Sequence, residues 1–370
     1  MNTIIGLLII AVGSMGQSSS YVPINKIKEW SWENFWLTQG IFAWLVFPIL
    51  GALITLSGPE LIEIYSSHSG AAWQAIGFGV LWGVGGLTFG LSMRFLGIAL
   101  GQSVALGTCA AFGTLIPAVL TGTNLLSPEG LVLLLAVTVT LVGIALVGYA
   151  GSLRSKNMSE EEKRKAIKDF ALKKGLLIAL LSGVMSACFS LGLSAGIPIK
   201  EAAIAAGAKE LFAQNPVTLL VTIGGFFTNM VYCLYMNRKN KTGGEIKRSS
   251  KGVLVNNLLF CALAGLLWYS QFFGLGMGQS FFEPGSVMMA FSWSILMSLN
   301  VVFSNVWGII LKEWKGAGRK AVAFLAIGMM VLIFSLVVPN LSLQGLLFGS
   351  IAVLIISLLI YSLLSIKKVR

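Results

Sequence analysis

Apolar stretches of about 20 residues follow one another along almost the whole chain, and a helix of that length crosses roughly 30 Å of hydrocarbon. Of the 370 residues, 56% are hydrophobic and only 11% are charged, and the mean hydropathy is +0.85. Soluble domains carry about 25% charged residues. The stretches also lack the alternation of polar and apolar residues that marks barrel strands. The sequence therefore predicts an all-α polytopic membrane protein, whose helices satisfy their own backbone hydrogen bonds in lipid.

Eleven membrane spans are predicted, with no stretch left over for a separate soluble domain. The expected ranges are 3–22, 36–56, 73–93, 99–121, 131–150, 174–196, 216–236, 252–274, 286–311, 320–338 and 343–366. The first residues carry no positive charge, and a basic connection follows the first span. We therefore expect a mature first helix rather than a signal peptide.

The basic residues predict the orientation of these spans. Of the 26 Lys and Arg residues, all but Lys200 and Lys209 fall in alternate connections or at the C-terminus. The positive-inside rule then places the N-terminus outside and the C-terminus in the cytoplasm. Charge gathered on one membrane face explains the net charge of +12, so no nucleic-acid partner is expected. The longest polar connection, Ser152–Lys174, is expected to form a short amphipathic helix rather than a docking site.

The two halves of the chain resemble each other. GLLI begins at Gly6 and again at Gly175, and the two segments end in VPINKIKE and GIPIKE. Because the first span starts outside and the sixth starts inside, the halves are predicted to be inverted five-helix repeats, an arrangement that transporters use to alternate access. The expected division is 1–151 for the first repeat, 152–173 for a cytoplasmic linker, 174–338 for the second repeat and 339–370 for an appended C-terminal helix.

Catalytic and metal-binding patterns are missing from the sequence. The only histidine, His68, falls in a short outward loop, and the four cysteines lie inside apolar segments without metal-like spacing. No paired acids or thiols could supply a nucleophile and its base. We therefore expect no enzyme activity, no cofactor and no metal.

Polar residues within the spans are more informative, because an unpaired polar group in lipid is costly. Amide and hydroxyl groups beside flat tryptophan rings suit the polar edges and apolar faces of a sugar. The expected substrate-binding residues are Gln17, Ser18, Ser19, Tyr21, Trp82, Asn229, Gln271 and Trp293. The first four belong to GQSSSYVP (16–23), interpreted as a wall of the sugar path or an inner gate. Interhelical hydrogen bonding, packing and interfacial anchoring are the alternatives.

Ionisable groups lie only near the ends of the predicted spans. If protons drive transport, a carboxylate must titrate between states. Glu33 and Glu201 are the proton-coupling candidates by elimination, with a solvated charge at a helix end as the alternative. Arg94 is expected to fix the cytoplasmic end of the third span.

Five segments resemble, in order, the L-rhamnose–proton symporter family, a branch of the drug/metabolite transporter superfamily. They are YVPINKIKEWSWENFW (21–36), LWGVGGLTFGLSMRFLGIALG (81–101), PIKEAAIAAG (198–207), GLLWYSQFFGLGMG (265–278) and GIILKEWKGAGRK (308–320). The resemblance runs from about residue 4 to residue 338. It implies a drug/metabolite transporter-like bundle, that is, a ten-helix, two-repeat carrier in a bacterial inner membrane that imports a deoxysugar with a proton. Leu296 stands where the family pattern has a histidine, and the eleventh span is an addition.

The favoured hypothesis is a secondary transporter of L-rhamnose or a related monosaccharide, with proton symport and alternating access between two repeats. A superfamily carrier of another small polar solute, running without a proton, is the alternative. A membrane sensor without a transport cycle is less favoured, because no signalling domain is found. The expected partners are the sugar, the proton and the bilayer, and the sequence does not indicate an oligomeric state.

Overall fold

The computed structural model describes residues 2–96, 98–156 and 171–365, and in these ranges the secondary structure is helical. Eleven helices are long and apolar enough to cross a membrane, which confirms the predicted polytopic, all-α fold class. The amphipathic helix expected within 152–174 lies largely outside the described residues. The bounds of the spans differ from the predicted ranges mainly because several helices continue into the connections.

The chain divides into two compact units that each combine segments from both halves of the sequence. Unit 1 comprises Met1–Val84 and Cys188–Phe282, and unit 2 comprises Gly85–Ala187 and Glu283–Arg370. Two long helices, α6 (Ser69–Leu96) and α10 (Leu172–Ala195), pass from one unit into the other.

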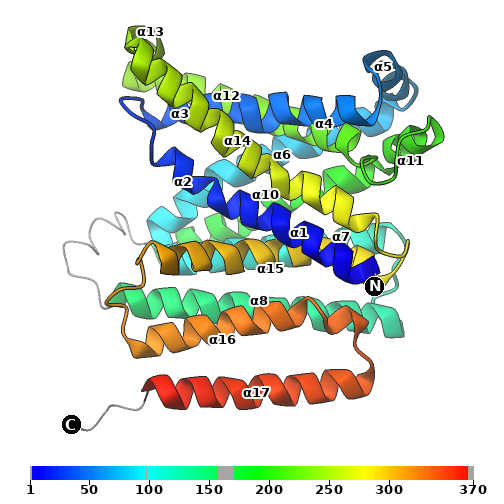
Figure 1. Cartoon of the computed structure of the whole chain (residues 1–370), viewed down its shortest axis with the longest axis vertical. Helices are drawn as coiled ribbons and strands as arrows, with labels where there is room; N and C mark the ends of the chain where they lie inside the picture. Colours follow the sequence, from blue (N-terminus) through cyan, green and yellow to red (C-terminus); the bar gives the residue numbers. More distant parts are fainter. Residues whose placement is uncertain (1, 97, 157–170, 366–370) are drawn as a thin grey trace. The chain divides into compact units, whose positions relative to one another are not determined.

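Unit 1 contains the first, second, seventh and eighth spans. In order, its elements are α1 (Asn2–Ser19), α2 (Tyr21–Ile24), α3 (Trp32–Gly40), η1 (Ile41–Val46), α4 (Phe47–Thr55), α5 (Gly58–Ser67), α11 (Ile197–Ala205), α12 (Asn215–Asn240), α13 (Glu245–Arg248) and α14 (Lys251–Gln279). Helix α1 runs along α14 (Figure 1). A side chain on Gly13 would meet the backbone of Ser270, and one on Gly278 would meet Gly6. Small residues therefore let these two spans approach closely.

One connection in unit 1 departs from the expected loop around His68. Helix α5 begins with a capping box, in which Glu60 accepts hydrogen bonds from the backbone and side chain of Ser57 (2.8 and 2.7 Å). Pro59 occupies the first turn, where its missing N–H has no cost. These local signals start a helix that hydropathy alone does not reveal, and His68 ends it.

Unit 2 contains the fourth, fifth and last three spans. They are α7 (Ile98–Leu120), α8 (Pro128–Lys156), α15 (Val287–Ile310), α16 (Arg319–Ser335) with the short η2 (Val338–Asn340), and α17 (Leu343–Ser365). Helices α8 and α16 pack closely, since a side chain on Gly328 would meet the backbone of Val147.

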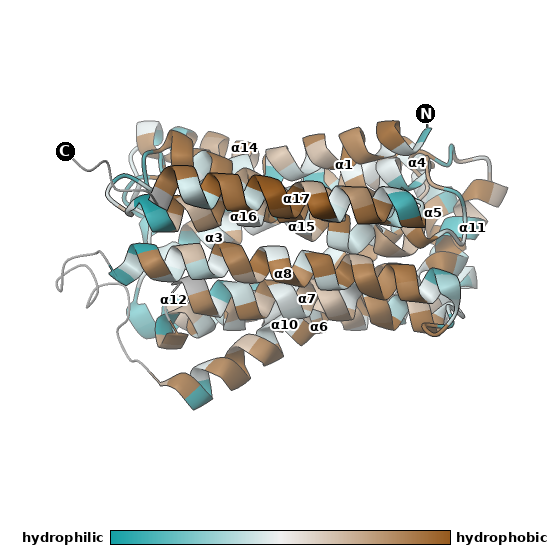
Figure 2. Cartoon of the chain, turned by 90° about the horizontal axis from the view of Figure 1, so that it is seen from below, coloured by the Kyte–Doolittle hydropathy of each residue, from teal (hydrophilic) through white to brown (hydrophobic). Residues whose placement is uncertain are grey.

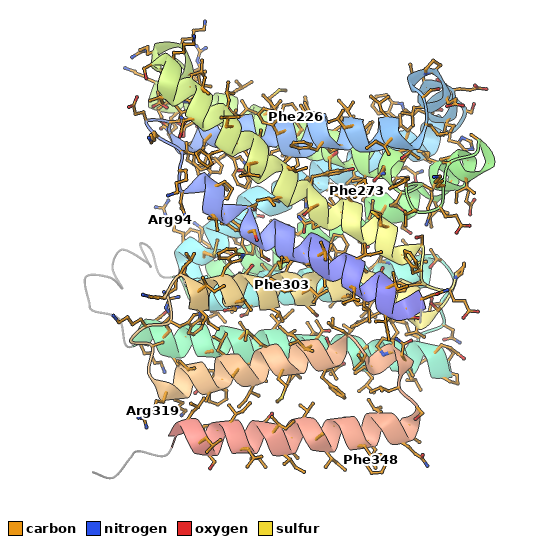
Figure 3. All side chains as sticks on the ribbon, viewed as in Figure 1. Arg94, Phe226, Phe273, Phe303, Arg319 and Phe348 are labelled. Carbon is orange, nitrogen blue, oxygen red and sulfur yellow. The ribbon has the colours of Figure 1, made fainter. Side chains whose placement is uncertain are left out.

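The eleventh span, α17, lies along α16 and is apolar over most of its length (Figure 2). Phe334 of α16 lies against Gly349, while Phe348 is 69% exposed and points away from α16 (Figure 3). An exposed apolar face of this kind is what a helix presents to lipid.

Candidate functional site

The second span of unit 1 is interrupted by a π-helical turn, η1, between α3 and α4. The N–H of Phe47 bonds to the carbonyl of Phe42, five residues earlier, instead of four. Pro48 follows at once in the first turn of α4. Proline donates no hydrogen bond and its ring crowds the preceding turn, so the backbone widens there. The wide turn carries Trp44 into the interior of unit 1, where it is 4% exposed.

Trp44 lies among three other tryptophans, and we call Trp36, Trp44, Trp82 and Trp268 the tryptophan cluster. Its ring meets those of Trp36, Trp82 and Trp268 edge to face, at centroid distances of 5.7, 6.1 and 5.8 Å. Trp82 and Trp268 lie 5.8 Å apart with a tilt of 39°. The four rings come from α3, η1, α6 and α14, so packing of three separate spans assembles the cluster.

Two glycines leave space for two of the rings in this cluster. A side chain on Gly40 would overlap the Trp44 ring, and one on Gly225 of α12 would overlap the Trp82 ring. Beyond Trp82 and Trp268 the aromatic surface continues through Phe189 and Phe272, which stack at 3.8 Å.

The polar atoms of the cluster differ in whether they have partners. The indole N–H of Trp36 donates to Oδ1 of Asn229 at 3.0 Å, and Nδ2 of Asn229 donates to the Gly225 carbonyl at 2.8 Å. The indole N–H of Trp44 is buried and has no hydrogen-bond partner among the described residues. On the same span, Oε1 of Gln39 is likewise buried without a partner there. A buried unpaired group costs roughly 1–3 kcal/mol.

This arrangement suits binding rather than catalysis. The rings offer flat apolar faces, Trp44 offers one donor, and the cluster contains no ionisable side chain. Gln39, five residues before Trp44 on the same span, has an acceptor without a partner among the described residues. Hydroxyl groups both donate and accept, so a neutral polyhydroxylated ring matches this chemistry. Among the described residues, no group of three or more His, Cys, Asp or Glu could hold a metal ion.

Of the predicted sugar-binding residues, the structure brings Trp82, Asn229 and Gln271 to the cluster or its edge. Gln271 is 4% exposed, and its side-chain amide donates to the Trp268 carbonyl at 3.2 Å. Trp82 belongs to the cluster itself, and Asn229 accepts from one of its members.

The GQSSSYVP residues form the end of the first span and the short helix after it. Ser18 is 2% exposed and its hydroxyl donates to the Gln17 side chain at 3.3 Å. Ser19 donates to the Met15 carbonyl at 2.7 Å, one helical turn back. Tyr21 is 57% exposed, so most of its ring lies on the surface of the chain.

Trp293 belongs to unit 2, on α15. Its indole N–H donates to the Cys109 carbonyl of α7 at 3.2 Å, and its ring lies against Gly113. Next to it, the hydroxyls of Ser294 and Thr114 lie 2.8 Å apart. Within unit 2 these contacts hold α7 and α15 together. Leu296, on the same helix, is fully buried.

The ionisable candidates lie in three different environments. Glu33, in the first turn of α3, is 4% exposed and accepts hydrogen bonds from Nδ2 of Asn240 (3.0 Å) and Oγ1 of Thr242 (2.6 Å). Glu201 is exposed on α11. Arg94 lies in the last turn of α6, in the part that belongs to unit 2 (Figure 3).

Comparison with known proteins decides the family. The family model described as L-rhamnose-proton symport protein (RhaT) matches residues 1–345. The chain belongs to the L-rhamnose-proton symport protein family. The resemblance found in the sequence is thereby confirmed.

Several relatives in this family cover almost the same length. Proteins named L-rhamnose-proton symporter from Yersinia pestis (strain Pestoides F) and Yersinia pseudotuberculosis serotype O:1b (strain IP 31758) are each 36% identical over 338 residues. The match covers 90% of this chain and 96% of each relative. Another protein of that name, from Yersinia pestis bv. Antiqua (strain Antiqua), gives the same identity and coverage.

Sequence reasoning missed Trp36, Trp44 and Gln39 as candidate site residues in this symport-family chain. A signal was available, because Pro48 interrupts an otherwise continuous apolar span. Broken helices in transporters commonly mark binding sites. Tryptophans near a span are more often interfacial anchors, so the tryptophans alone did not distinguish Trp44 from the others.

Proposed function

We propose that this chain imports L-rhamnose or a related monosaccharide together with a proton, and that unit 1 binds the sugar at the tryptophan cluster. Membership of the symport family supports the substrate and the coupling. The observation that carries the location is the buried N–H of Trp44 in the tryptophan cluster, which has no hydrogen-bond partner among the described residues. A deoxysugar has both an apolar face, which stacks on rings, and hydroxyl groups, which satisfy such a donor.

In this proposal a sugar hydroxyl accepts from Trp44 and another donates to Oε1 of Gln39, while Trp82 and Trp268 contact the ring faces. Asn229 fixes Trp36 through its indole N–H, and Gln271 supports the backbone of α14 beside Trp268. Binding would therefore satisfy two groups that have no partner in the described part of the chain, which favours a polyhydroxylated solute over an apolar one.

Glu33 is the better of the two proton-coupling candidates. It is buried and its carboxylate has hydrogen-bond donors on α12 and in the connection after it, so a rearrangement of these segments would change its proton affinity. Glu201 is exposed on α11, and no hydrogen bond within the described residues holds its carboxylate. Loss of the Asn240 and Thr242 contacts in a second conformation would make Glu33 take up a proton.

The wider proposal retains the architecture expected from the sequence. Two inverted repeats, 1–151 and 174–338, alternate access in a bacterial inner membrane, with the N-terminus outside and the C-terminus in the cytoplasm. Gln17, Ser18, Ser19 and Tyr21 contribute to a wall or inner gate, Trp293 is a further substrate-binding candidate, and Arg94 fixes the end of α6. A superfamily carrier of another polar solute without a proton is the alternative.

The test is uptake of labelled L-rhamnose and other sugars into proteoliposomes, with and without an imposed pH gradient. We expect rhamnose flux that the gradient accelerates and a protonophore reduces. Flux that ignores both would replace symport with uncoupled transport, and binding without flux would favour a sensor.

Two variants locate the site and the coupling group in the same assay. Trp44→Phe should weaken sugar binding, whereas Trp73→Phe, at a position 71% exposed on α6, should not. Glu33→Gln should leave sugar exchange measurable while removing acceleration by the pH gradient. Acceleration that persists in this variant would exclude Glu33 as the coupling group.

A further inference from the structure

Eight exposed basic residues gather at one end of unit 1, where α3 begins and α12 ends. We call them the basic platform: Lys26, Lys28, Arg238, Lys239, Lys241, Lys247, Arg248 and Lys251. They come from two connections that lie more than 200 residues apart in the sequence, one before α3 and one around α13. Helix α13 stands at the end of α14 in Figure 1.

Hydrogen bonds hold these two connections together. Asn257, which is fully buried, accepts from the N–H of Lys28 at 3.0 Å and donates to its carbonyl at 2.7 Å. Asn256 donates to the Lys26 carbonyl at 3.0 Å, and the Trp30 indole donates to the Ser249 hydroxyl at 2.8 Å. The basic side chains therefore stand on a fixed backbone rather than on two independent loops.

The buried or half-buried carboxylates near the platform accept hydrogen bonds from other parts of unit 1. Glu245 accepts from the N–H of Ser31 and the side chain of Asn34, both at 2.7 Å, and so caps the start of α3. Glu33 is buried with its own donors. Glu29 is exposed. In the described part of unit 1 no salt bridge neutralises a platform residue. The charge of Arg248 also helps to lower the pKa of Glu245, so this one cation has a nearby carboxylate. The positive charge of the other platform residues is left for a partner outside the chain.

Exposed aromatic rings mark the level of this end in a membrane. Trp32 is 42% exposed, Tyr232 is 38% exposed and Tyr235 is 59% exposed, and the first two rings meet edge to face at 6.3 Å. Tryptophan and tyrosine collect at the height of the lipid headgroups. Along α12, the platform residues come after Tyr232 and Tyr235 in the sequence, and before α3 they come ahead of Trp32. With these rings at the headgroup level, the cations lie at the level of the lipid phosphate groups.

We propose that the basic platform binds the phosphate groups of anionic phospholipids. Clusters of four to eight Lys and Arg residues directly beside a membrane span attract anionic headgroups, and the attraction falls off within a Debye length. A soluble phosphate has the same chemistry, but the aromatic level places lipid phosphates next to the cations at high local concentration. The inference does not depend on the transported solute or on proton coupling.

The test compares two variants with equal loss of charge, reconstituted in nanodiscs or analysed by native mass spectrometry. The first is Lys239→Gln with Lys247→Gln and Lys251→Gln, in the platform. The matched control is Lys312→Gln with Lys315→Gln and Lys320→Gln, all exposed in unit 2. The probes are phosphatidylglycerol, phosphatidylcholine of the same chains, and soluble glycerol phosphate.

We expect wild type and control to retain phosphatidylglycerol in preference to phosphatidylcholine, and the platform variant to bind it on the order of a hundredfold more weakly. Soluble glycerol phosphate in excess should not displace the lipid. Equal weakening in both variants would show that only net charge matters and would overturn the proposal, as would displacement by glycerol phosphate. Thermal unfolding of each variant establishes that the fold is retained.

Discussion

Replacing only the indole N–H of Trp44 should weaken sugar binding without loosening the protein. The suitable change is benzothienylalanine, which keeps the two-ring shape and puts sulfur in place of the N–H. Because this donor has no partner among the described residues, its removal relieves an unpaired group that costs roughly 1–3 kcal/mol. The sugar-free protein should therefore be as stable as wild type or more so.

The affinity should change in the opposite direction. If a sugar hydroxyl accepts a hydrogen bond from this N–H, the variant loses roughly 1–3 kcal/mol of binding free energy. Its dissociation constant for the sugar should then be about 5- to 150-fold higher. Isothermal titration with L-rhamnose in detergent measures the affinity, and thermal unfolding of the same samples measures the stability. Trp44→Phe is easier to make, but it adds a cavity whose cost obscures the stability comparison.

Trp36 supplies the matched control for this replacement. Its N–H donates to Asn229 at 3.0 Å, so benzothienylalanine at position 36 leaves that acceptor without its donor. The same atomic change should therefore destabilise the protein at position 36 and not at position 44. Unchanged sugar affinity for the Trp44 replacement, in a protein that still binds sugar, would refute the assignment of the cluster as the site.

Three further changes test the packing around the cluster and the platform. Gly225→Ala should displace the Trp82 ring. This change should lower the free energy of unfolding by roughly 1–3 kcal/mol and should also weaken sugar binding. The control is Gly77→Ala, which faces open space and should change neither the stability nor the affinity. Asn257→Ala removes three hydrogen bonds, two with the Lys28 backbone and one from the Asn256 side chain, and should cost about 3 kcal/mol in thermal unfolding. An unchanged melting temperature would contradict this. Partial burial opposes ionisation of Glu245, but the hydrogen bonds that its carboxylate accepts outweigh burial and lower its pKa. A carboxyl whose pKa is lower in the folded protein than in the unfolded chain stabilises the fold at pH values above the ordinary glutamate pKa of about 4.3. This stabilisation is lost as the pH falls through the pKa of the folded state. The stability difference between wild type and Glu245→Gln should therefore be largest at neutral pH and vanish in acid, as unfolding across a pH series would show.

Signals close together in the sequence predicted much of the fold. Runs of apolar residues gave eleven spans, and five short segments gave the family. Helix α5 was missed because its start depends on Ser57, Pro59 and Glu60 acting together, and hydropathy does not register a cap. The sequence also predicted Trp82 and Asn229, because a ring or an amide inside a span needs a partner somewhere.

The sequence by itself determined that this chain spans a membrane repeatedly and belongs to the symport family, since hydropathy and motif order are properties of neighbouring residues. Only the tertiary structure decided which polar groups are paired. Trp36 and Trp44 lie eight residues apart on one span, yet Asn229 on α12 reaches only the first. The partner of an indole N–H depends on which distant helix packs against it and on the π turn that directs the ring. No local pattern contains that information.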